Sequence, residues 1–379
     1  MSKKILKVSF QDRNSNLCVE QFLDYNNPLL KDWEVVFNNP SLRKADAWFV
    51  IEALNSNDTF CEVNPHNIFF GSAETAQNIN HFEGYKSRLQ FLSQFSRVFT
   101  FHQYLGANAE NSPPFLPWMI NSNHGDSIWL AHERDVEFLE NLNFLEKTKS
   151  LSIFCSTQAL TPAHEMRLRF TSKLKDYFGA ELDWIGNGVN SVSEKWLGLN
   201  QYKYNIVLEN QKRYNVITEK LGDAFLGLTF PYYWGAPNIG SVFDIRGLTE
   251  IDIEDFGKTV SIIEHGLKSN KYEKNLDYII KNKSIVLHEF NFINRMLKLV
   301  ESYSADYNNV SQVHLLDENS FLNSSTRSYS ILQKSFKNLI LPIDAALGVN
   351  LYEIATSFYK LIRYNKLTKL IVRMICKNV

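Results

Sequence analysis

The sequence has little cysteine and almost no net charge. Its four cysteines, Cys18, Cys61, Cys155 and Cys376, lie far apart, so no Cys-x-x-Cys pair for zinc or redox chemistry is present. This scarcity disfavours a secreted disulfide framework and favours a reducing compartment, so we expect a cytoplasmic protein. Forty Lys and Arg against 41 Asp and Glu give a formal net charge of −1. Proteins that bind nucleic acids usually have a basic excess, so we expect no nucleic-acid partner.

Long hydrophobic runs are also missing. No window of about 20 apolar residues occurs, which predicts that no segment spans a membrane. The chain begins with Met1-Ser2-Lys3-Lys4-Ile5-Leu6-Lys7-Val8. The apolar part of this segment is too short, and contains too many charges, for a secretory signal peptide.

Several common catalytic motifs are incomplete. Gly257-Lys258-Thr259 resembles the end of a phosphate-binding P-loop, but Asp252 stands where that loop needs its first glycine. Gly186 and Gly188 lack the third glycine of a dinucleotide fingerprint, so we interpret them as a turn, with a turn beside a ligand as the alternative. The nine histidines form no His-x-x-x-His pair, and no Gly-x-Ser-x-Gly elbow occurs. We therefore expect no metal held by the protein.

The composition is that of a globular protein with more than one domain. Of 379 residues, 44% are hydrophobic and 21% charged, and the usual domain size of about 150 residues predicts roughly two or three domains. Short apolar runs alternate with segments of helical periodicity, which is typical of α/β domains with a mostly parallel sheet. The expected strands are 5–10, 45–51, 67–70, 97–101, 150–154, 205–208 and 230–234, and the expected helices are 85–95, 164–178 and 218–228. We expect α/β domains over 1–148 and 149–330 with a cleft between them, followed by a helical segment over 331–379.

One stretch combines polar residues in a pattern suited to binding a nucleotide sugar. Glu209 and Asn210 follow an apolar strand, and Thr218 is suited to N-cap a helix whose first turn holds Glu219 and Lys220. In open α/β sheets, ligands bind beyond the carboxyl ends of the strands, where helix N-termini attract phosphate. This favours Lys220 as a ligand for a diphosphate and Glu219 as an acceptor for sugar hydroxyls. A capped surface helix with an ordinary Glu–Lys pair is the alternative.

These residues resemble the signature of the α1,3-fucosyltransferases, glycosyltransferase family 10. Leu208-Glu209-Asn210 and Ile217-Thr218-Glu219-Lys220 have the family's spacing, and Phe230-Pro231-Tyr232-Tyr233-Trp234-Gly235 follows them. The resemblance is strong over 203–242 and weaker but collinear from about residue 69, and it is greatest to the bacterial members. It implies a GT-B fold of two Rossmann-like domains, with the acceptor domain first. It also implies an inverting transfer of L-fucose from GDP-β-L-fucose to a sugar hydroxyl, without a covalent intermediate. We expect no metal or other cofactor, because a lysine, an arginine and a helix N-terminus would take the place of a metal at the diphosphate.

The resemblance also implies roles for single residues in the donor site. Lys220 corresponds to the ligand of the diphosphate, Glu219 to that of ribose or fucose hydroxyls, and Asn210 shapes the pocket. Arg167 matches a family arginine on the helix after the first strand of the donor domain. Further candidates for this site are Arg169, Glu209, Gly186 and Gly188.

The chain departs from the family at one position of the motif. Val216 stands where the family usually has a tyrosine directly before the Val-Thr-Glu-Lys string, and Tyr214, two residues earlier, is the candidate substitute. A transferase of the same fold that uses another GDP-sugar is therefore an alternative. A catalytically inactive glycan-binding protein is an alternative of a different class.

The catalytic base is expected at the end of a strand in the first domain. The family places its base glutamate there, and Glu74 matches that place after Ile68-Phe69-Phe70, with the register off by one. A glutamate in a surface turn is the alternative. The nearby Glu52 and Glu83 serve as controls, and their Gln variants are expected to stay active.

The C-terminal segment has two interpretations. Its basic residues fall at spacings of three and four, and its apolar residues share much of the opposite side of a helix. Such a helix either lies on an anionic membrane surface or packs across the domains. The basic residues are Lys360, Arg363, Lys366, Lys369, Arg373 and Lys377. The first interpretation suits an oligosaccharide or glycolipid acceptor of lipopolysaccharide biosynthesis or protein glycosylation, fucosylated at O3 of N-acetylglucosamine or glucose on the inner face of the cytoplasmic membrane.

Overall fold

The computed structural model describes residues 2–10, 17–54, 57–73, 84–102, 108–122, 134–157 and 162–321. The chain divides into two units, Met1–Asn80 with Leu92–Leu316, and His81–Phe91 with Asp317–Val379. In the second unit, Arg88 of helix α2 (Gly84–Leu92) lies 3.2 Å from Glu318. The predicted C-terminal helix over 331–379 and its basic residues lie outside the described part of the chain. The two sheets and the candidate site described below belong to the first unit.

The first sheet consists of six parallel strands in the order β2-β1-β3-β5-β6-β7. This is a doubly wound order, in which the chain first moves to one side of β1 and then returns to the other. Every residue of the central strand β3 is buried, as expected for a parallel strand covered on both faces. The strands are β1 (Lys4–Phe10), β2 (Trp33–Phe37), β3 (Ala47–Ile51), β5 (Ile68–Gly71), β6 (Arg97–Thr100) and β7 (Ala109–Asn111).

The second sheet repeats this order with five parallel strands, β12-β11-β10-β8-β9. The chain leaves β8 and β10 in opposite directions, so the topological switch point lies between them, and a ligand is expected at their carboxyl ends. The strands are β8 (Lys149–Phe154), β9 (Leu182–Ile185), β10 (Tyr202–Leu208), β11 (Phe230–Trp234) and β12 (Thr249–Glu250).

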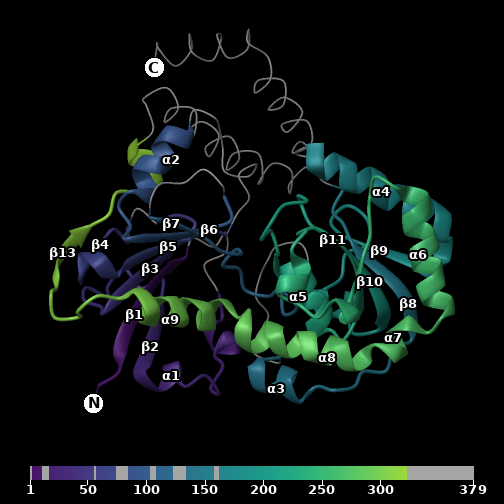
Figure 1. Cartoon of the computed structure of the whole chain (residues 1–379), viewed down its shortest axis with the longest axis horizontal. Coiled ribbons are helices and arrows are strands. Elements are labelled where there is room, and N and C mark those ends of the chain that lie inside the picture. Colours follow the sequence, from purple (N-terminus) through teal and green to yellow (C-terminus); the bar gives the residue numbers. More distant parts are fainter. Residues whose placement is uncertain are drawn as a thin grey trace, which may run out of the picture. The chain divides into compact units, whose positions relative to one another are not determined.

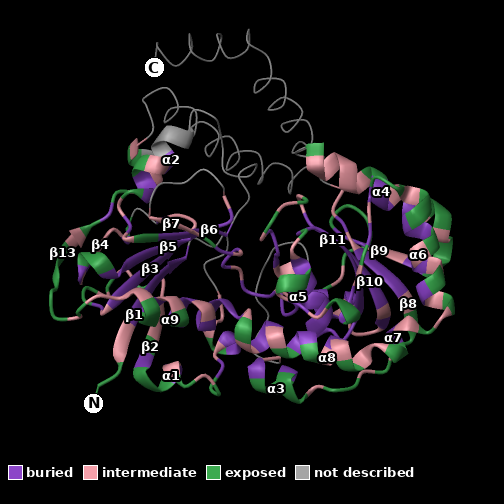
Figure 2. Ribbon diagram, in the orientation of Figure 1, coloured by how far each residue is buried: buried purple, intermediate pink, exposed green. Residues whose placement is uncertain are grey.

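Helices cover both faces of the second sheet (Figure 1). Helices α4 (Pro162–Phe178) and α6 (Phe256–Lys268) share one face, where the rings of Phe170 and Phe256 lie 6.1 Å apart. Helix α5 (Glu219–Leu226) follows β10 and lies on the other face. The central strands β10 and β11 are almost wholly buried, whereas α4 and α6 have exposed outer surfaces (Figure 2). Further helices are α1 (Leu29–Asp32), α3 (Val136–Asn141), α7 (Lys271–Lys274) and α8 (Leu276–Ser284), and the described chain also has several short 3-10 turns.

After α8, the chain returns to the first sheet. A π-helical turn (Ile285–Glu289) leads into α9 (Phe292–Tyr303), and β13 (Ser311–His314) then pairs antiparallel with β4 (Phe60–Val63). On α9, Glu301 accepts hydrogen bonds from Lys4 and Trp33, and Arg295 donates to the carbonyl oxygen of Pro114 at 2.8 Å. The segment 292–314 therefore contacts the first sheet although it lies inside the range 149–330 expected for the second domain. The domain boundaries stay predictions.

The predicted α/β fold with two Rossmann-like sheets is confirmed. All seven expected strands and all three expected helices are present, with ends shifted by a few residues. The sequence analysis did not find β2, β4, β7, β9, β12 and β13. No helix in the described ranges is long and apolar enough to cross a membrane.

Candidate functional site

A fully buried carboxylate anchors the start of α5. Glu209 directly follows β10 and is 0% exposed. Its two oxygens accept hydrogen bonds from the backbone N (2.8 Å) and the Oγ1 (2.7 Å) of Thr218, the N-cap residue of α5. Burial raises the pKa of Glu209, although Lys220 and the bonds from Thr218 oppose this effect. Because Thr218 engages both oxygens, Glu209 holds the loop against the helix, and its contact with a ligand stays a prediction.

Glu219 and Lys220 form a charged pair in the first turn of α5. The Nζ of Lys220 lies 3.0 Å from the Oε1 of Glu219, 3.0 Å from the Oγ1 of Thr218 and 3.7 Å from the Oε2 of Glu209. Burial alone would raise the pKa of Glu219, but the charges of Lys220 and Lys195 bring it down to about 2. Burial would lower the pKa of Lys220, but Glu219 and Glu209 hold it above its usual value. Both side chains are therefore charged at neutral pH, and the Lys220 side chain keeps 24% of its surface exposed.

Two basic side chains of α4 reach the same edge of the sheet. The Nη1 of Arg167 donates to the carbonyl oxygen of Leu208, the last residue of β10, at 3.4 Å. The Nε of Arg167 is buried and has no hydrogen-bond partner among the described residues. His164 precedes Arg167 by one turn, and burial, with the charges of Arg167 and Lys220, lowers its pKa to about 4. The ring is therefore neutral at pH 7. The sequence analysis missed His164, although its spacing of three residues from Arg167 places both on one helix face.

Other buried polar atoms lack a partner at this edge. The Oδ1 of Asn210, directly after Glu209, and the Nε1 of Trp234, the last residue of β11, have no hydrogen-bond partner in the part of the chain that the structure describes. Buried polar groups are hydrogen-bonded in the great majority of cases. Together with the Nε of Arg167, these atoms suit a polar ligand that supplies both donors and acceptors.

Gly186 and Gly188 allow a turn to pack against the loop after β8. A Cβ on Gly186 would lie 2.3 Å from the carbonyl oxygen of Cys155. Gly188 has a φ of +86°, and a Cβ there would lie 2.0 Å from the Oγ1 of Thr157. Close backbone approach and a left-handed conformation therefore explain both glycines. Their contact with a ligand stays a prediction.

The other donor-site candidates lie on exposed surfaces. The side chain of Arg169 is 75% exposed and lies 3.8 Å from Glu165 on the same helix, which favours Arg167 as the arginine of the site. Tyr214 is 59% exposed. Val216, at the position of the family tyrosine, is 0% exposed and belongs to the core.

The predicted base Glu74 lies outside the described residues, as does Glu83. The described chain reaches Ala73, two residues beyond the end of β5 at Gly71. The backbone N of Ala73 donates to the Oε2 of Glu52 at 2.8 Å, and Glu52 has a left-handed backbone with φ of +63°. Glu52 thus contacts the residue before Glu74, so it is not a neutral control for that residue. The assignment of Glu74 stays a prediction.

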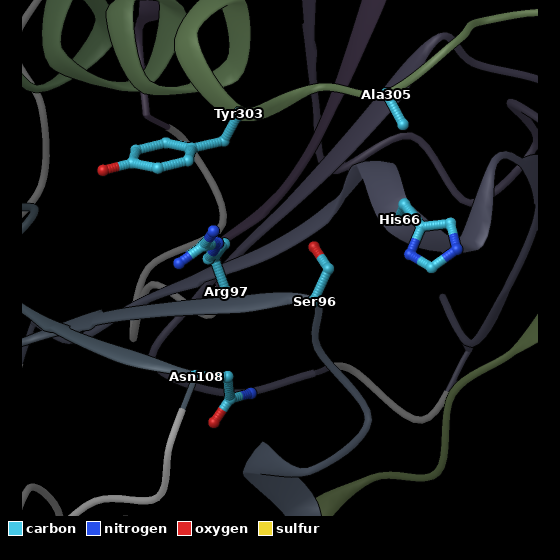
Figure 3. A pocket seen from close by; sticks show the side chains of 6 residues that line it. All are labelled: His66, Ser96, Arg97, Asn108, Tyr303 and Ala305. Carbon is cyan, nitrogen blue, oxygen red and sulfur yellow. The ribbon is translucent and has the colours of Figure 1, made fainter.

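A separate pocket lies beside the amino ends of β5 and β6. Several of its lining side chains already have partners: Arg97 and Tyr303 both contact Glu110, at 2.8 and 2.5 Å, and Asn108 donates to the carbonyl oxygen of Phe95. Ligands of parallel sheets bind at the opposite, carboxyl edge. We assign no ligand to this pocket. It is lined by His66, Ser96, Arg97, Asn108, Tyr303 and Ala305 (Figure 3).

Comparisons with known proteins agree with the motif. No protein-family model matches the chain. The α-(1,3)-fucosyltransferase FucT of Helicobacter pylori is 25% identical over 218 residues, which cover 53% of this chain and 44% of that enzyme. The match thus spans less than half the length of this curated relative.

Similar solved structures include an α1,3-fucosyltransferase with GDP (17% identity, 81% of this chain and 93% of that chain, TM-score 0.46). The structure of an α1,3-fucosyltransferase with GDP-fucose is 17% identical, covers 80% of this chain and 93% of that chain, and has a TM-score of 0.41. HepE of Anabaena in complex with UDP is 11% identical, with 79% and 99% coverage and a TM-score of 0.39. By its motif and by its likeness to the Helicobacter enzyme, the chain resembles the α1,3-fucosyltransferases of glycosyltransferase family 10.

Proposed function

We propose that this protein transfers L-fucose from GDP-β-L-fucose to a hydroxyl group of an acceptor sugar, with inversion at the transferred carbon. The observation that carries the proposal is the convergence of Lys220, Glu219 and Arg167 at the carboxyl ends of β8 and β10. This is the position where doubly wound sheets bind nucleotides. The solved relatives named above bind GDP and GDP-fucose.

The cationic groups suit the diphosphate of the donor. Lys220 and Arg167 each carry a full positive charge, and the backbone N–H groups at the start of α5 add partial charge. During transfer, negative charge accumulates on the diphosphate as its bond to fucose breaks. Positive groups held in place before the reaction stabilise that charge without reorganisation. The proposed reaction therefore needs no divalent metal.

The ionised carboxylate of Glu219 suits the hydroxyl groups of the donor. A carboxylate accepts hydrogen bonds and donates none, so it pairs with the ribose or fucose hydroxyls and disfavours a second anion. The Oδ1 of Asn210 is a further acceptor and the Nε1 of Trp234 a further donor. A nucleotide sugar is rich in both kinds of partner.

The transfer is a single displacement. The acceptor oxygen forms its bond to C1 of fucose on the face opposite the diphosphate, the bond from C1 to the diphosphate oxygen breaks, and GDP leaves. The proton of the acceptor hydroxyl passes to the carboxylate of Glu74, which acts as the general base. This role for Glu74 rests on the family resemblance and on its place in the sequence, three residues after the end of β5 at Gly71.

The acceptor in this proposal is a bacterial surface glycan, such as lipopolysaccharide or a glycoprotein, modified at O3 of N-acetylglucosamine or glucose. The enzyme would act in the cytoplasm, where the 331–379 segment would contact the anionic inner surface of the membrane. A transferase for another GDP-sugar is the second candidate. It is favoured by the buried Val216, which cannot give a donor the contact of the family tyrosine.

A calorimetric screen with GDP, GDP-fucose, GDP-mannose and UDP-sugars tests the proposal, followed by turnover with a sugar acceptor. We expect binding of GDP and GDP-fucose, weaker binding of UDP-sugars, and release of GDP. Preferred turnover of GDP-mannose would establish the second candidate. Absence of GDP binding would contradict both, and binding without turnover of any donor would indicate the inactive glycan-binding protein.

A further inference from the structure

A buried ion pair lies one helical turn after Glu219. The Nζ of Lys195 is 2.5 Å from the Oδ2 of Asp223, and the two side chains are 9% and 0% exposed. Asp223 belongs to α5, four residues after Glu219, whereas Lys195 begins the 3-10 turn between β9 and β10. Burying two charges costs free energy unless their other hydrogen-bonding groups are also satisfied.

The other groups of this pair bind a distant segment of the chain. The Oδ1 of Asp223 accepts a hydrogen bond from the backbone N of Met119 at 2.7 Å. The backbone N of Lys195 donates to the carbonyl oxygen of Ser122 at 3.0 Å. The segment 119–122 follows the last strand of the first sheet by eight residues. Lys195 and Asp223 therefore join the helix of the donor motif to a segment outside the second sheet.

Lys195 also acts on Glu219 by its charge. Only burial and the charge of Lys220 affect the pKa of Glu219 more than Lys195 does, and Lys195 favours the ionised carboxylate. Arg167 on α4 also favours that form, whereas Glu209 after β10 and Asp223 on α5 itself oppose it. The ionisable groups that face Glu219 or its cation partners come from five segments of the described chain and are Lys195, Lys220, Arg167, His164, Glu209, Asp223 and Cys155.

We propose that Lys195 and Asp223 are positioning residues of the donor site. The pair holds the first turn of α5 against residues 119–122, and Lys195 supplies the second positive charge beside Glu219. This inference rests on the proposed function, because GDP is the probe that reads the state of Glu219. It concerns residues outside the sequence motif, and it makes the donor site depend on a tertiary contact.

The test is the GDP affinity of the full chain, measured by calorimetry over a range of pH, with thermal unfolding followed in parallel. Lys195→Met removes the charge next to Glu219. Asp223→Asn removes the opposing charge but keeps an oxygen for the backbone N of Met119. Glu194→Gln is the matched control, because it breaks the neighbouring 2.8 Å ion pair with Arg134.

We expect Lys195→Met to weaken GDP binding about tenfold at pH 7.5, since one charge of a buried pair is lost. As the pH is lowered, the GDP affinity of Lys195→Met should begin to fall at a higher pH than the GDP affinity of the wild type. The reason is that Glu219 takes up a proton more easily once the charge of Lys195 is gone. Asp223→Asn should not move this decline to higher pH, and Glu194→Gln should match the wild type. A merely structural pair would weaken binding without moving the pH profile.

A wild-type pH profile for Lys195→Met would overturn the inference, as would an equal displacement in Glu194→Gln. If Lys195→Met does not fold, the double variant Lys195→Met/Asp223→Asn provides the test, since it leaves no unpaired buried charge. The GDP affinity of this double variant must also fall at a higher pH than the GDP affinity of the wild type. Failure of the wild type to bind GDP would refute the proposed function, whereas normal binding by every variant would refute this inference alone.

Discussion

Lys220→Ala is expected to weaken GDP binding by about 1.5–3 kcal/mol, the usual worth of a hydrogen bond to a charged group. This corresponds to a roughly 10- to 150-fold increase in Kd. The Nζ of Lys220 is held in place by Thr218 and Glu219, at 3.0 Å each, and its side chain is still 24% exposed. The ammonium group is therefore preorganised and accessible to a diphosphate, so little of its interaction energy is spent on ordering the side chain.

The same substitution affects stability, and the assay must separate the two effects. Without Lys220, the buried Glu209 loses a cation 3.7 Å away, and breaking a buried pair costs about 3–5 kcal/mol when the remaining charge cannot adjust. Glu209 can adjust by taking up a proton, because burial already raises its pKa. We therefore expect a lower Tm but a folded protein at 15–20 °C, roughly the temperature of maximum stability. Calorimetric titration with GDP should be made there, with circular dichroism as the check on folding.

Lys212→Ala is the matched control. Lys212 lies in the loop between β10 and α5, its side chain is 52% exposed, and its ion pair with Asp252 spans 3.9 Å. Such surface pairs contribute about 0–1 kcal/mol, so GDP affinity should stay within about twofold of the wild type. The reasoning would be refuted if folded Lys220→Ala bound GDP as tightly as the wild type, or if Lys212→Ala lost as much affinity.

Further predictions concern the other charged groups. Arg167→Ala should raise the Kd for GDP about tenfold or more, whereas Arg169→Ala, on the exposed face of α4, should leave it unchanged; equal effects would contradict the choice of Arg167. Because the pKa of Glu219 is lowered from 4.5 to about 2, its contribution of about 3 kcal/mol to stability is present above pH 4.5 and is lost as the pH falls toward 2. Urea unfolding at several pH values should show that Glu219→Gln loses less free energy of unfolding on acidification than the wild type does. An identical loss in both proteins would show that other groups cause it. Glu74→Gln should lower kcat about 10²–10⁴-fold and leave GDP binding intact; near wild-type turnover would place the base elsewhere. Activity should survive EDTA, and a loss that magnesium or manganese reverses would disprove the metal-free mechanism.

The strands that could be predicted from the sequence are mainly those that are buried along most of their length. Such strands appear in the sequence as nearly continuous apolar runs. All five residues of β3 and of β11 are buried, and the last five of β10 are as well. In β2 and β9 only some positions are buried. Glu34 and Asp183 stand among the apolar residues of these strands, so their sequences show no clear hydrophobic period. The antiparallel pairing of β4 with β13 has no local signal at all, because its partners come from opposite ends of the described chain.

The same distinction applies to the site. The order Glu209, Thr218, Glu219, Lys220 is local, so the sequence placed these residues together, and the structure brings Arg167 to them. Sequence alone did not reveal that Thr218 engages both oxygens of Glu209, since that depends on the path of the loop between them. It also gave no indication of the ion pair between α5 and the turn after β9, which exists only in the folded chain.

The return of the chain to the first sheet has a consequence for how the protein is synthesised. The backbone N of Ala305 donates to the Oδ1 of Asn67, 238 residues earlier, and β13 supplies the only described strand that pairs with β4. On the ribosome, the N-terminal strands therefore emerge long before the segment that completes their surroundings. Until then β4 presents an unpaired edge, which is a template for contacts between chains. A nascent chain of this protein, or a fragment that ends at residue 148, should consequently depend on chaperones and aggregate in their absence, whereas in the folded chain β13 closes that edge.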